Sequence, residues 1–300
     1  MRVRVLGSAA GGAFPQWNCG CDNCRAVREG RPGFLPRTED SLAVSGDGAR
    51  YVLVNAAPSV GEQLRRTREL WPRDVRSTPI GVIVLTNGDL DHTLGLFSLR
   101  ESQPLAIYAT RTVREGLERN AILKTLARFP GHTVFRDLVL GQETEIADAG
   151  GTPLGLAVKA VAAPGKRALH LEGSTEPSAE DNVALAFSAG AKARLVYAAT
   201  YGKTGGFLSE AEGAGAAFFD GTFYSEHEMA SRGCGEKPAA SMAHLPVSEA
   251  LAALEAVRCG RKIFTHVNNT NPMLDPESAA AREVRSRGFE IAYDGMEIDL

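Results

Sequence analysis

The sequence predicts an α/β fold, a single domain in which helices cover sheets of many short strands. Two observations support this prediction. Short apolar segments alternate with amphipathic stretches along most of the 300 residues. Glycine is abundant, with 32 residues, which favours many tight loops over long helices. The sequence contains no internal repeat of fixed period.

The composition is that of an ordinary folded protein, with 44% hydrophobic and 23% charged residues. It excludes a disordered chain, a coiled coil and a collagen-like fibre. The formal net charge is −3, which provides no general electrostatic attraction to nucleic acid or to an anionic membrane. We therefore expect neither as a partner.

Residues 1–7 alternate apolar and polar side chains as a strand does, and a loop follows. They lack the basic start, apolar centre and cleavage site of a secretory signal. No stretch approaches the roughly 18 apolar residues that a membrane span needs. Three of the five cysteines fall within six residues, a spacing that suits a metal better than stabilising disulfides. These features predict a cytoplasmic protein without membrane insertion.

The next elements follow from the periodicity of the apolar side chains. Residues 50–55 are expected to form a strand, and residues 60–70 have helical spacing. Residues 80–85 are a continuous apolar run, as in a strand buried on both faces. A helix is expected over residues 93–100.

Later in the chain, short apolar runs predict further strands, and one segment with helical spacing predicts a late helix over residues 246–257. The predicted strands cover residues 105–109, 183–187, 195–198, 216–219 and 262–265. The loops expected at residues 28–37, 164–180 and 233–239 are too short and too little biased to be domain linkers. We therefore expect one domain over residues 1–300.

The common nucleotide-binding and hydrolase motifs are absent. Gly7, Gly11 and Gly12 follow the first strand but do not fit G-x-G-x-x-G. The Gly-Lys-Thr at residues 202–204 lacks the upstream glycine of a phosphate loop, and no G-x-S-x-G elbow occurs.

Cys19, Cys21 and Cys24 form a C-x-C-x-x-C motif. Thiolates at this spacing can converge on a tetrahedral zinc ion, and three thiolates fill most of its shell, so a structural Zn²⁺ site is expected. The alternative is a loop of free or redox-active thiols. A fourth ligand must come from elsewhere in the chain, and Cys234 and Cys259 are both candidates.

Carboxylates and imidazoles follow several predicted strands. Asp89, Asp91 and His92 come directly after the strand at residues 80–85. Ligand sites in α/β folds lie at the carboxyl ends of strands, where loop side chains converge. Taken alone, this motif is equally consistent with Asp91 capping a helix beside a partly exposed His92.

The pattern recurs further along the chain, which favours a site. Asp220 ends one later strand and His266 ends another. Together with Asp91 and His92, these residues are of the types that hold a divalent metal. His244 stands at the start of the late helix and is a candidate for acid–base work or substrate binding.

These residues, in this order, resemble the metallo-β-lactamase superfamily, which implies a four-layer αββα sandwich with metals at one edge. The usual signature, His-x-His-x-Asp-His, is altered in this chain. Asn87 and Asp89 replace the two leading histidines, and residues 163–166 (Ala-Pro-Gly-Lys) stand where a middle histidine falls. The resemblance places the bridging aspartate at Asp220 and the final histidine at His266.

Within that superfamily, the chain resembles the B-protein family of pyrroloquinoline quinone (PQQ) biosynthesis along its whole length. The most specific strings are Phe-Pro-Gln-Trp-Asn-Cys at residues 14–19 and His-Val-Asn-Asn-Thr-Asn-Pro at residues 266–272. A phosphodiesterase relative shares the cysteine motif and takes its fourth zinc ligand from a histidine. Asn269 stands at the matching position, as the possible fourth-ligand position of this chain.

The altered ligand set implies a single active-site metal held by His92, His266 and one or two carboxylates from Asp89, Asp91 and Asp220. Two imidazoles and a carboxylate with open positions are the arrangement of non-haem Fe(II) oxygenases. The resemblance therefore implies Fe(II)- and O₂-dependent hydroxylation of the tyrosine ring in a cross-linked Glu–Tyr precursor, a small molecule or dipeptide. His244 would transfer a proton.

Two further hypotheses stay open. One is a zinc-dependent hydrolase of phosphodiesterase type that uses Asp89 as an unusual ligand. The other is a carrier that binds PQQ or its precursor without catalysis.

Overall fold

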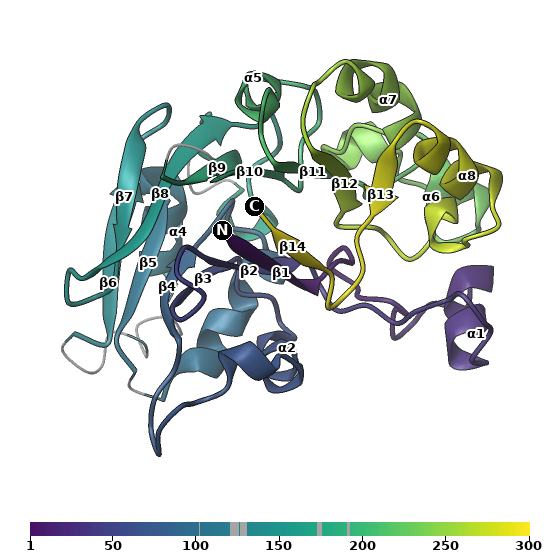
Figure 1. The fold of residues 1–300 in the computed structure, drawn as a ribbon. Coiled ribbons are helices and arrows are strands. Elements are labelled where there is room, and N and C mark those ends of the chain that lie inside the picture. Colours follow the sequence, from purple (N-terminus) through teal and green to yellow (C-terminus); the bar gives the residue numbers. More distant parts are fainter. Residues whose placement is uncertain (102, 121–125, 127–130, 173–175, 191–192) are drawn as a thin grey trace.

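The computed structural model describes residues 1–101, 103–120, 126, 131–172, 176–190 and 193–300. Two seven-stranded mixed sheets form its centre (Figure 1). The first sheet contains, in spatial order, β14 (Glu297–Asp299), β1 (Arg2–Gly7), β2 (Ser41–Ser45), β3 (Tyr51–Val54), β4 (Ile80–Val84), β5 (Leu105–Thr110) and β6 (Thr133–Leu138). The second contains β13 (Phe289–Ile291), β12 (Arg261–Thr265), β11 (Ala216–Asp220), β10 (Ala193–Ala198), β9 (Val183–Ala189), β8 (Pro153–Ala162) and β7 (Glu143–Ala147).

The strands that carry the site are parallel neighbours. In the first sheet, β4 lies between β3 and β5 and is parallel to both. In the second sheet, β11 lies parallel to β10 and β12. The chain segment that connects two parallel neighbouring strands must return to the start of the second strand. The loops that leave β4, β11 and β12 therefore emerge at carboxyl ends of strands.

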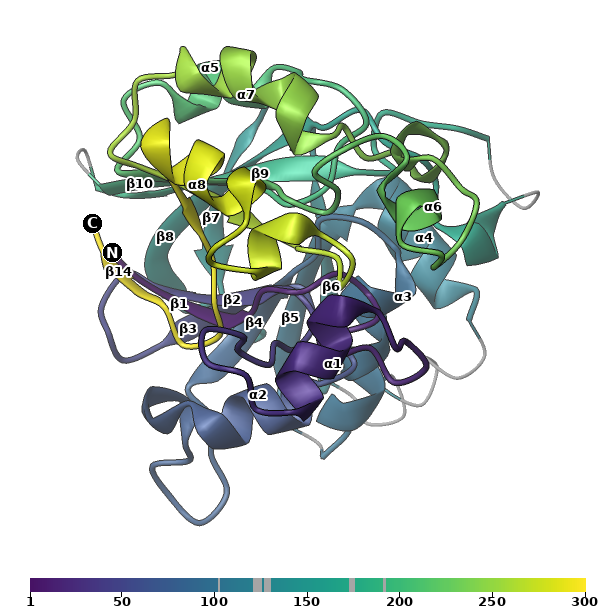
Figure 2. The ribbon, with the colours of Figure 1, turned by 90° about the vertical axis from the view of Figure 1, so that its right-hand side faces the viewer.

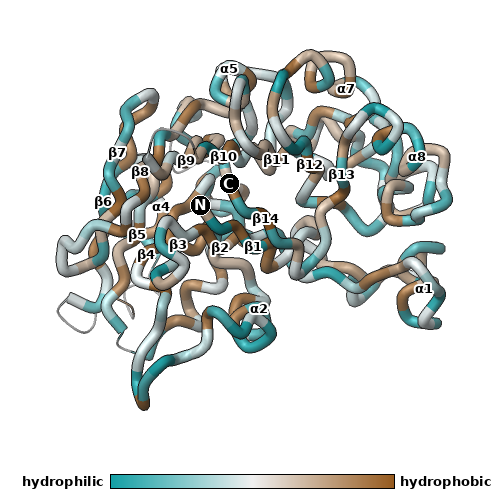
Figure 3. Tube along the Cα trace, viewed as in Figure 1, coloured by the Kyte–Doolittle hydropathy of each residue, from teal (hydrophilic) through white to brown (hydrophobic). Residues whose placement is uncertain are grey.

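The hydrophobic core has three parts, which define four layers. One cluster, which includes Val44, Val84, Leu185 and Phe218, lies between the two sheets. The other two clusters lie on the outer faces, under helices. Figure 2 shows α5 and α7 on the outer side of one sheet and α2 on the outer side of the other. Many residues of the strands are hydrophobic, whereas those of α2 are mostly hydrophilic (Figure 3).

The helices are short. They are α1 (Asp22–Arg28), α2 (Val60–Arg66), α3 (Leu90–Thr93), α4 (Arg111–Glu118), α5 (Phe207–Ala211), α6 (Glu228–Ser231), α7 (Val247–Glu255) and α8 (Ala279–Ser286). The late helix predicted over residues 246–257 is confirmed as α7. The helix predicted over residues 60–70 ends at Arg66, and a 3₁₀ turn follows over residues 68–70.

The helix predicted over residues 93–100 is wrong in its bounds and type. Regular helix covers only α3, and residues 94–99 form a 3₁₀ segment. Gly95 allows this segment to pack closely against the backbone of Ala57. A Cβ at position 95 would lie only 2.1 Å from the carbonyl oxygen of Ala57. The early helix start brings His92 into the helix and onto its buried side.

The eight strands expected within residues 1–7, 50–55, 80–85, 105–109, 183–187, 195–198, 216–219 and 262–265 are confirmed. Six strands were not predicted: β2, β6, β7, β8, β13 and β14. Residues 173–175 of the loop predicted over 164–180 lie outside the described residues. Among the described helices, none is long and apolar enough to cross a membrane.

The two ends of the chain meet in the first sheet. β14 pairs antiparallel with β1, and the amide of Leu300 donates to the carbonyl of Met1 over 2.8 Å. Both termini therefore lie side by side (Figure 1).

Candidate metal centre

The loop after β4 places the first ligand pair. It contains Asp89, Asp91 and His92, and α3 begins at Leu90. His92 is 1% exposed, and Asp89, not Asp91, stands at the N-cap position of α3, without a side-chain capping bond. The alternative in which Asp91 caps a helix beside a partly exposed His92 is therefore wrong.

The loops after β11 and β12 bring in the second half of the chain. Asp220 is the last residue of β11, and His266 follows β12 directly. His266 has a φ of 56°, a left-handed conformation that is uncommon for a residue with a side chain. Backbone strain of this kind is concentrated at functional sites, where the surrounding structure maintains it.

Asp91, His92 and His266 form one compact group, and their ligand atoms all lie within 4.8 Å of one another. Nε2 of His266 lies 3.1 Å from Oδ2 of Asp91, and Nε2 of His92 lies 3.9 Å from the same oxygen. Two ligand atoms bound at ~2.1 Å to one ion, at a right angle, lie about 3 Å apart. The spacing therefore fits a shared divalent cation.

The hydrogen bonds of His92 leave one of its nitrogens free for a metal. Nδ1 lies 2.9 Å from Oδ1 of Asn87 and 3.1 Å from Oγ1 of Thr86. Since the Thr86 hydroxyl donates to Asn55, both oxygens accept from His92 Nδ1–H. Nε2 is buried and has no hydrogen-bond partner among the described residues. A neutral imidazole with this tautomer offers an Nε2 lone pair to a cation.

His266 is oriented in the same way by Thr222. Its Nδ1 lies 2.8 Å from Oγ1 of Thr222, and this hydroxyl donates to Oδ1 of Asp220 over 2.6 Å. The threonine oxygen therefore accepts from His266 Nδ1–H, and Nε2 is turned toward Asp91. Neither Thr86 nor Thr222 was predicted as a site residue.

Asp220, His244 and His266 form a second group, which shares His266 with the first. Nδ1 of His244 lies 2.7 Å from Oδ2 of Asp220. Asp220 also accepts from the amides of Tyr201 and Thr222 and from the Thr222 hydroxyl. A carboxylate has about four acceptor positions, so these four contacts use its hydrogen-bonding capacity.

Burial and the charges of neighbouring side chains shift the pKa values of Asp91, His92 and His266. Removal from water opposes ionisation of Asp91, but the charges of His92 and His266 and a hydrogen bond from His266 hold the pKa of Asp91 well below its usual range. Burial also opposes the charge on His266, yet the bond to Asp91 raises the pKa of His266 to about 9. Burial lowers the pKa of His92. Without a metal, the Asp91–His266 pair therefore holds a proton where a cation would lie.

A cavity of about 330 Å³ opens onto this cluster. Asp89, Asp91, Lys166, His244 and His266 are among the residues that line it. Burial and the charge of Asp91 raise the pKa of Asp89, and the charge of Lys166 opposes that shift. Asp89 is not a member of either group of candidate ligands.

A buried carboxylate that the sequence did not single out connects the two sheets beneath the centre. Asp40, which precedes β2, accepts hydrogen bonds from the hydroxyls of Tyr197 in β10 and Thr265 in β12. It is fully buried, and burial raises its pKa to about 6. Thr265 precedes His266, so this contact fixes the end of β12.

The cysteine motif lies on a separate but neighbouring part of the surface. Nδ2 of Asn269 lies 3.1 Å from Sγ of Cys19, 3.7 Å from Sγ of Cys21 and 3.5 Å from Sγ of Cys24. Cys234 approaches from another segment, whereas Cys259 is not in the group, and all five cysteines are free thiols. The structure therefore brings the three predicted sulfur atoms and Asn269 together.

Comparisons with known proteins give the family of the chain. Residues 50–267 match the Beta-lactamase superfamily domain. The chain is 41% identical to the Coenzyme PQQ synthesis protein B of Methylobacterium sp. (strain 4-46), with 100% of both chains covered. It is 39% identical to the protein of that name from Rhizobium meliloti (strain 1021), covering 100% of this chain and 98% of the relative.

Two solved structures show the same fold. The crystal structure of Zn²⁺-bound PqqB from Methylobacterium extorquens matches with a TM-score of 0.93 at 36% identity, over 100% of both chains. A diphosphatase of the PhnP family matches with a TM-score of 0.69 at 19% identity, which concerns the fold alone. The chain belongs to the coenzyme PQQ synthesis protein B family of the metallo-β-lactamase superfamily.

Proposed function

We propose that this protein acts in PQQ synthesis as a mononuclear non-haem iron hydroxylase. The substrate would be a small molecule or dipeptide that contains a cross-linked glutamate and tyrosine, and the reaction would hydroxylate the tyrosine ring. The observation that carries the proposal is the group of Asp91, His92 and His266, in which two imidazole nitrogens surround one carboxylate oxygen.

The donor set fits a divalent metal with open positions. Nε2 of His92 is buried without a hydrogen-bond partner among the described residues, and Nε2 of His266 faces the same carboxylate oxygen. Two histidines and one carboxylate are the set that non-haem Fe(II) oxygenases use. A ferrous ion bound there would supply activation of O₂ for hydroxylation of the ring.

Asp220 and His244 would form the proton-transfer pair. The Asp220 carboxylate holds Nδ1 of His244 at 2.7 Å, which fixes the ring and leaves Nε2 for the cavity. His244 can then accept the phenolic proton of the substrate, and the buried negative charge of Asp220 stabilises the imidazolium that forms. Asp89, whose pKa burial raises, is the second group on the cavity wall that can hold a proton.

The cavity walls fit a polar aromatic amino acid. Phe223 and Met242 offer apolar contacts, while Lys166 offers a positive charge for a substrate carboxylate. The reaction places one oxygen atom of O₂ in a ring C–H bond and reduces the other to water, so it consumes two electrons from an external reductant. The proposal therefore includes a reductant as co-substrate.

Anaerobic reconstitution with Fe(II) tests this function. The iron-loaded protein, a cross-linked Glu–Tyr substrate and ascorbate are mixed before O₂ is admitted, and oxygen uptake and product mass are measured. We expect O₂-dependent gain of one oxygen atom by the substrate, lost in His92→Ala and His266→Ala. The control is His227→Ala, which removes an exposed histidine outside the centre.

Other outcomes would redirect the assignment. Equal turnover with zinc alone, or no oxygen uptake with iron, contradicts an iron hydroxylase. Binding of a substrate analogue that persists unchanged in His92→Ala and His266→Ala, without turnover in the wild type, would favour a carrier. Two metal ions per centre together with phosphodiester cleavage would favour a zinc hydrolase.

A further inference from the structure

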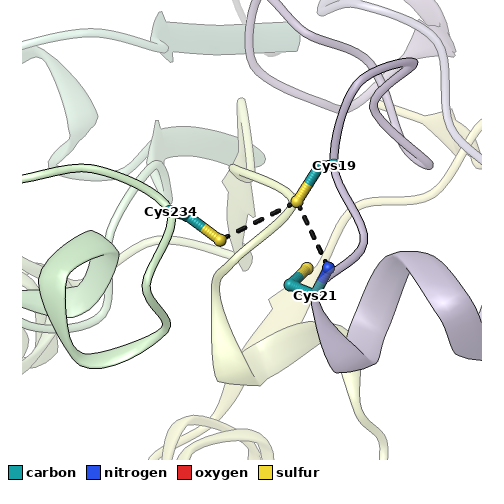
Figure 4. Close-up of side chains that lie close together, drawn as sticks. All are labelled: Cys19, Cys21 and Cys234. Atoms are coloured by element: carbon teal, nitrogen blue, oxygen red, sulfur yellow. Dashed lines mark hydrogen bonds between the residues drawn. The ribbon is translucent and has the colours of Figure 1, made fainter.

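We propose that Cys234 is the fourth ligand of a tetrathiolate zinc site formed with Cys19, Cys21 and Cys24. The three cysteines of the C-x-C-x-x-C motif come from one short segment before and within α1. Cys234 comes from the loop after α6, more than 200 residues later in the chain. Figure 4 shows Cys19 and Cys21 on one side and Cys234 facing them from the other.

The sulfur atoms of Cys19, Cys21 and Cys234 lie at a spacing that fits this assignment, whereas Cys24 lies outside this compact group. Sγ of Cys19 and Sγ of Cys234 lie 3.8 Å apart, and Cys19, Cys21 and Cys234 form a group whose sulfur atoms all lie within 4.8 Å. A tetrahedral zinc ion with Zn–S bonds of ~2.3 Å has S···S edges of about 3.8 Å. The Cys19–Cys234 pair therefore already has the length of one edge of such a tetrahedron.

Asn269 is the competing fourth ligand, since its amide lies beside three of the sulfur atoms. Structural zinc sites are built from cysteine and histidine ligands, and an amide oxygen is a harder and weaker donor. In the structure the Asn269 side chain presents its N–H group to the sulfur atoms. Such N–H···S contacts stabilise bound thiolates from outside the ligand shell. Asn269 is therefore a positioning residue in this assignment.

The segment that carries Cys234 is held in place for this role. The amide of Cys234 donates to the carbonyl of Met229 over 2.9 Å, and Gly233 adopts a φ of 64° that allows the sharp turn. Arg232 lies 3.8 Å from Asp22 of α1, across the same gap that the zinc ion would bridge. An ion pair from Arg232 and a metal ligand two residues later would thus join this loop to α1.

The bridge has a consequence for the iron site proposed above. The loop that carries Cys234 runs between Phe223 and His244, and both of these residues line the cavity at the metal centre. Met229, in α6, lines that cavity and also the surface hollow beside the cysteines. A zinc ion bound by Cys234 would therefore restrain the middle of a loop whose ends form one wall of the active-site cavity.

Cobalt substitution of the full-length protein tests the ligand assignment. Thiolate-to-cobalt charge-transfer absorption scales with the number of bound thiolates, so Cys234→Ser should lose about a quarter of its intensity. The variant should also release zinc to a chelator faster than the wild type. Cys259→Ser is the matched control, because it removes a cysteine of similar exposure outside the group.

Two more variants keep the test decisive. Cys234→His supplies an alternative zinc ligand, so it should retain zinc while losing the same share of charge-transfer intensity. Hydrogen exchange of residues 223–244 should increase in Cys234→Ser and not in Cys259→Ser. The assignment would be overturned in favour of Asn269 by two results together. Cys234→Ser would keep the full charge-transfer intensity of the wild type, and Asn269→Ala would change that intensity. Both readouts are independent of hydroxylase activity, so either proposal can fail alone.

Discussion

Nε2 of His266 lies 3.1 Å from Oδ2 of Asp91, although the two residues are 175 positions apart in the chain. Asp91 follows a strand of the first sheet, and His266 follows a strand of the second. The contact therefore exists only because both sheets present these strand ends at the same edge of the sandwich.

Thr222→Val should weaken metal binding by about 10- to 100-fold, because it removes the oxygen that orients His266 but keeps the shape of the side chain. Thr222 is 3% exposed and contacts both His266 and Asp220. Titration of the metal-free variant with Fe(II) or Zn²⁺ measures the change. Thr222→Ser, which restores the hydroxyl, should recover most of the affinity. An unchanged affinity in Thr222→Val would show that the hydrogen bond does not position the ring.

Gly11→Ala should weaken metal binding by roughly tenfold, or ~1.4 kcal/mol, without removing any ligand. A Cβ at Gly11 would lie 3.0 Å from Oδ2 of Asp91 and 3.2 Å from its Cβ, so the carboxylate would have to turn away. Gly61→Ala is the control, since a Cβ there would meet only the end of the Arg65 side chain, at 3.4 Å. Equal affinities in the two variants would contradict the prediction.

The stability of the protein should fall as the pH rises from about 5 to 7, in part because of Glu228. Burial raises the pKa of this carboxyl to about 7 from an ordinary 4.5. Between these values the folded state binds a proton that the unfolded state has released, so the contribution is present below pH 4.5 and is lost as the pH passes 7. The slope contributed by one such group is at most about 1.4 kcal/mol per pH unit.

Urea unfolding at several pH values measures this dependence. Glu228→Gln should reduce the slope between pH 5 and 7, whereas Glu277→Gln, at an exposed position, should leave it unchanged. Asp40, with a pKa of about 6, contributes to the same window, so a residual slope is expected in Glu228→Gln. A slope equal to that of the wild type would contradict the prediction for Glu228.

Tyr197→Phe should destabilise the protein by about 1–3 kcal/mol, because it removes a donor from a fully buried carboxylate. The Tyr197 hydroxyl donates to Asp40, and Thr265 is the other donor to that group. The loss should also raise the pKa of Asp40 further, since fewer hydrogen bonds stabilise its charge. Thermal unfolding measures the effect, with Tyr293→Phe at a 44% exposed position as the control. A similar stability for both variants would show that the Asp40 contact is dispensable.

The sequence was most informative where a strand contains an apolar run. β4 and β11 are almost entirely apolar, whereas β10 and β12 become apolar after a basic start, so the positions of all four could be predicted. The polar residues that follow β4, β11 and β12 could be predicted with them. β8 also had a usable signal, because Leu154, Leu156, Val158 and Ala160 alternate with more exposed residues and all face the core. The edge strands β6, β7, β13 and β14 are short or partly exposed and carry no comparable pattern.

The same contrast applies to the centre. The motif around Asp91 and the strand-end His266 could be found in the sequence because both follow apolar runs. Thr222 and Asp40 could not, since their roles depend on contacts between segments that only the folded chain brings together. Cys234 was recognised as a candidate ligand beside Cys259, but only the packing of the loop after α6 against α1 distinguishes the two.

The division of the centre between the two sheets has a consequence for biosynthesis. A nascent chain on the ribosome carries Asp91 and His92 long before residue 266 is synthesised, and this adjacent pair alone offers too few donors to retain an ion. Metal capture must therefore await release of nearly the entire polypeptide and the docking of its last strands. Loading of the metal and completion of folding are in this way coupled, and a truncated chain would not retain the ion.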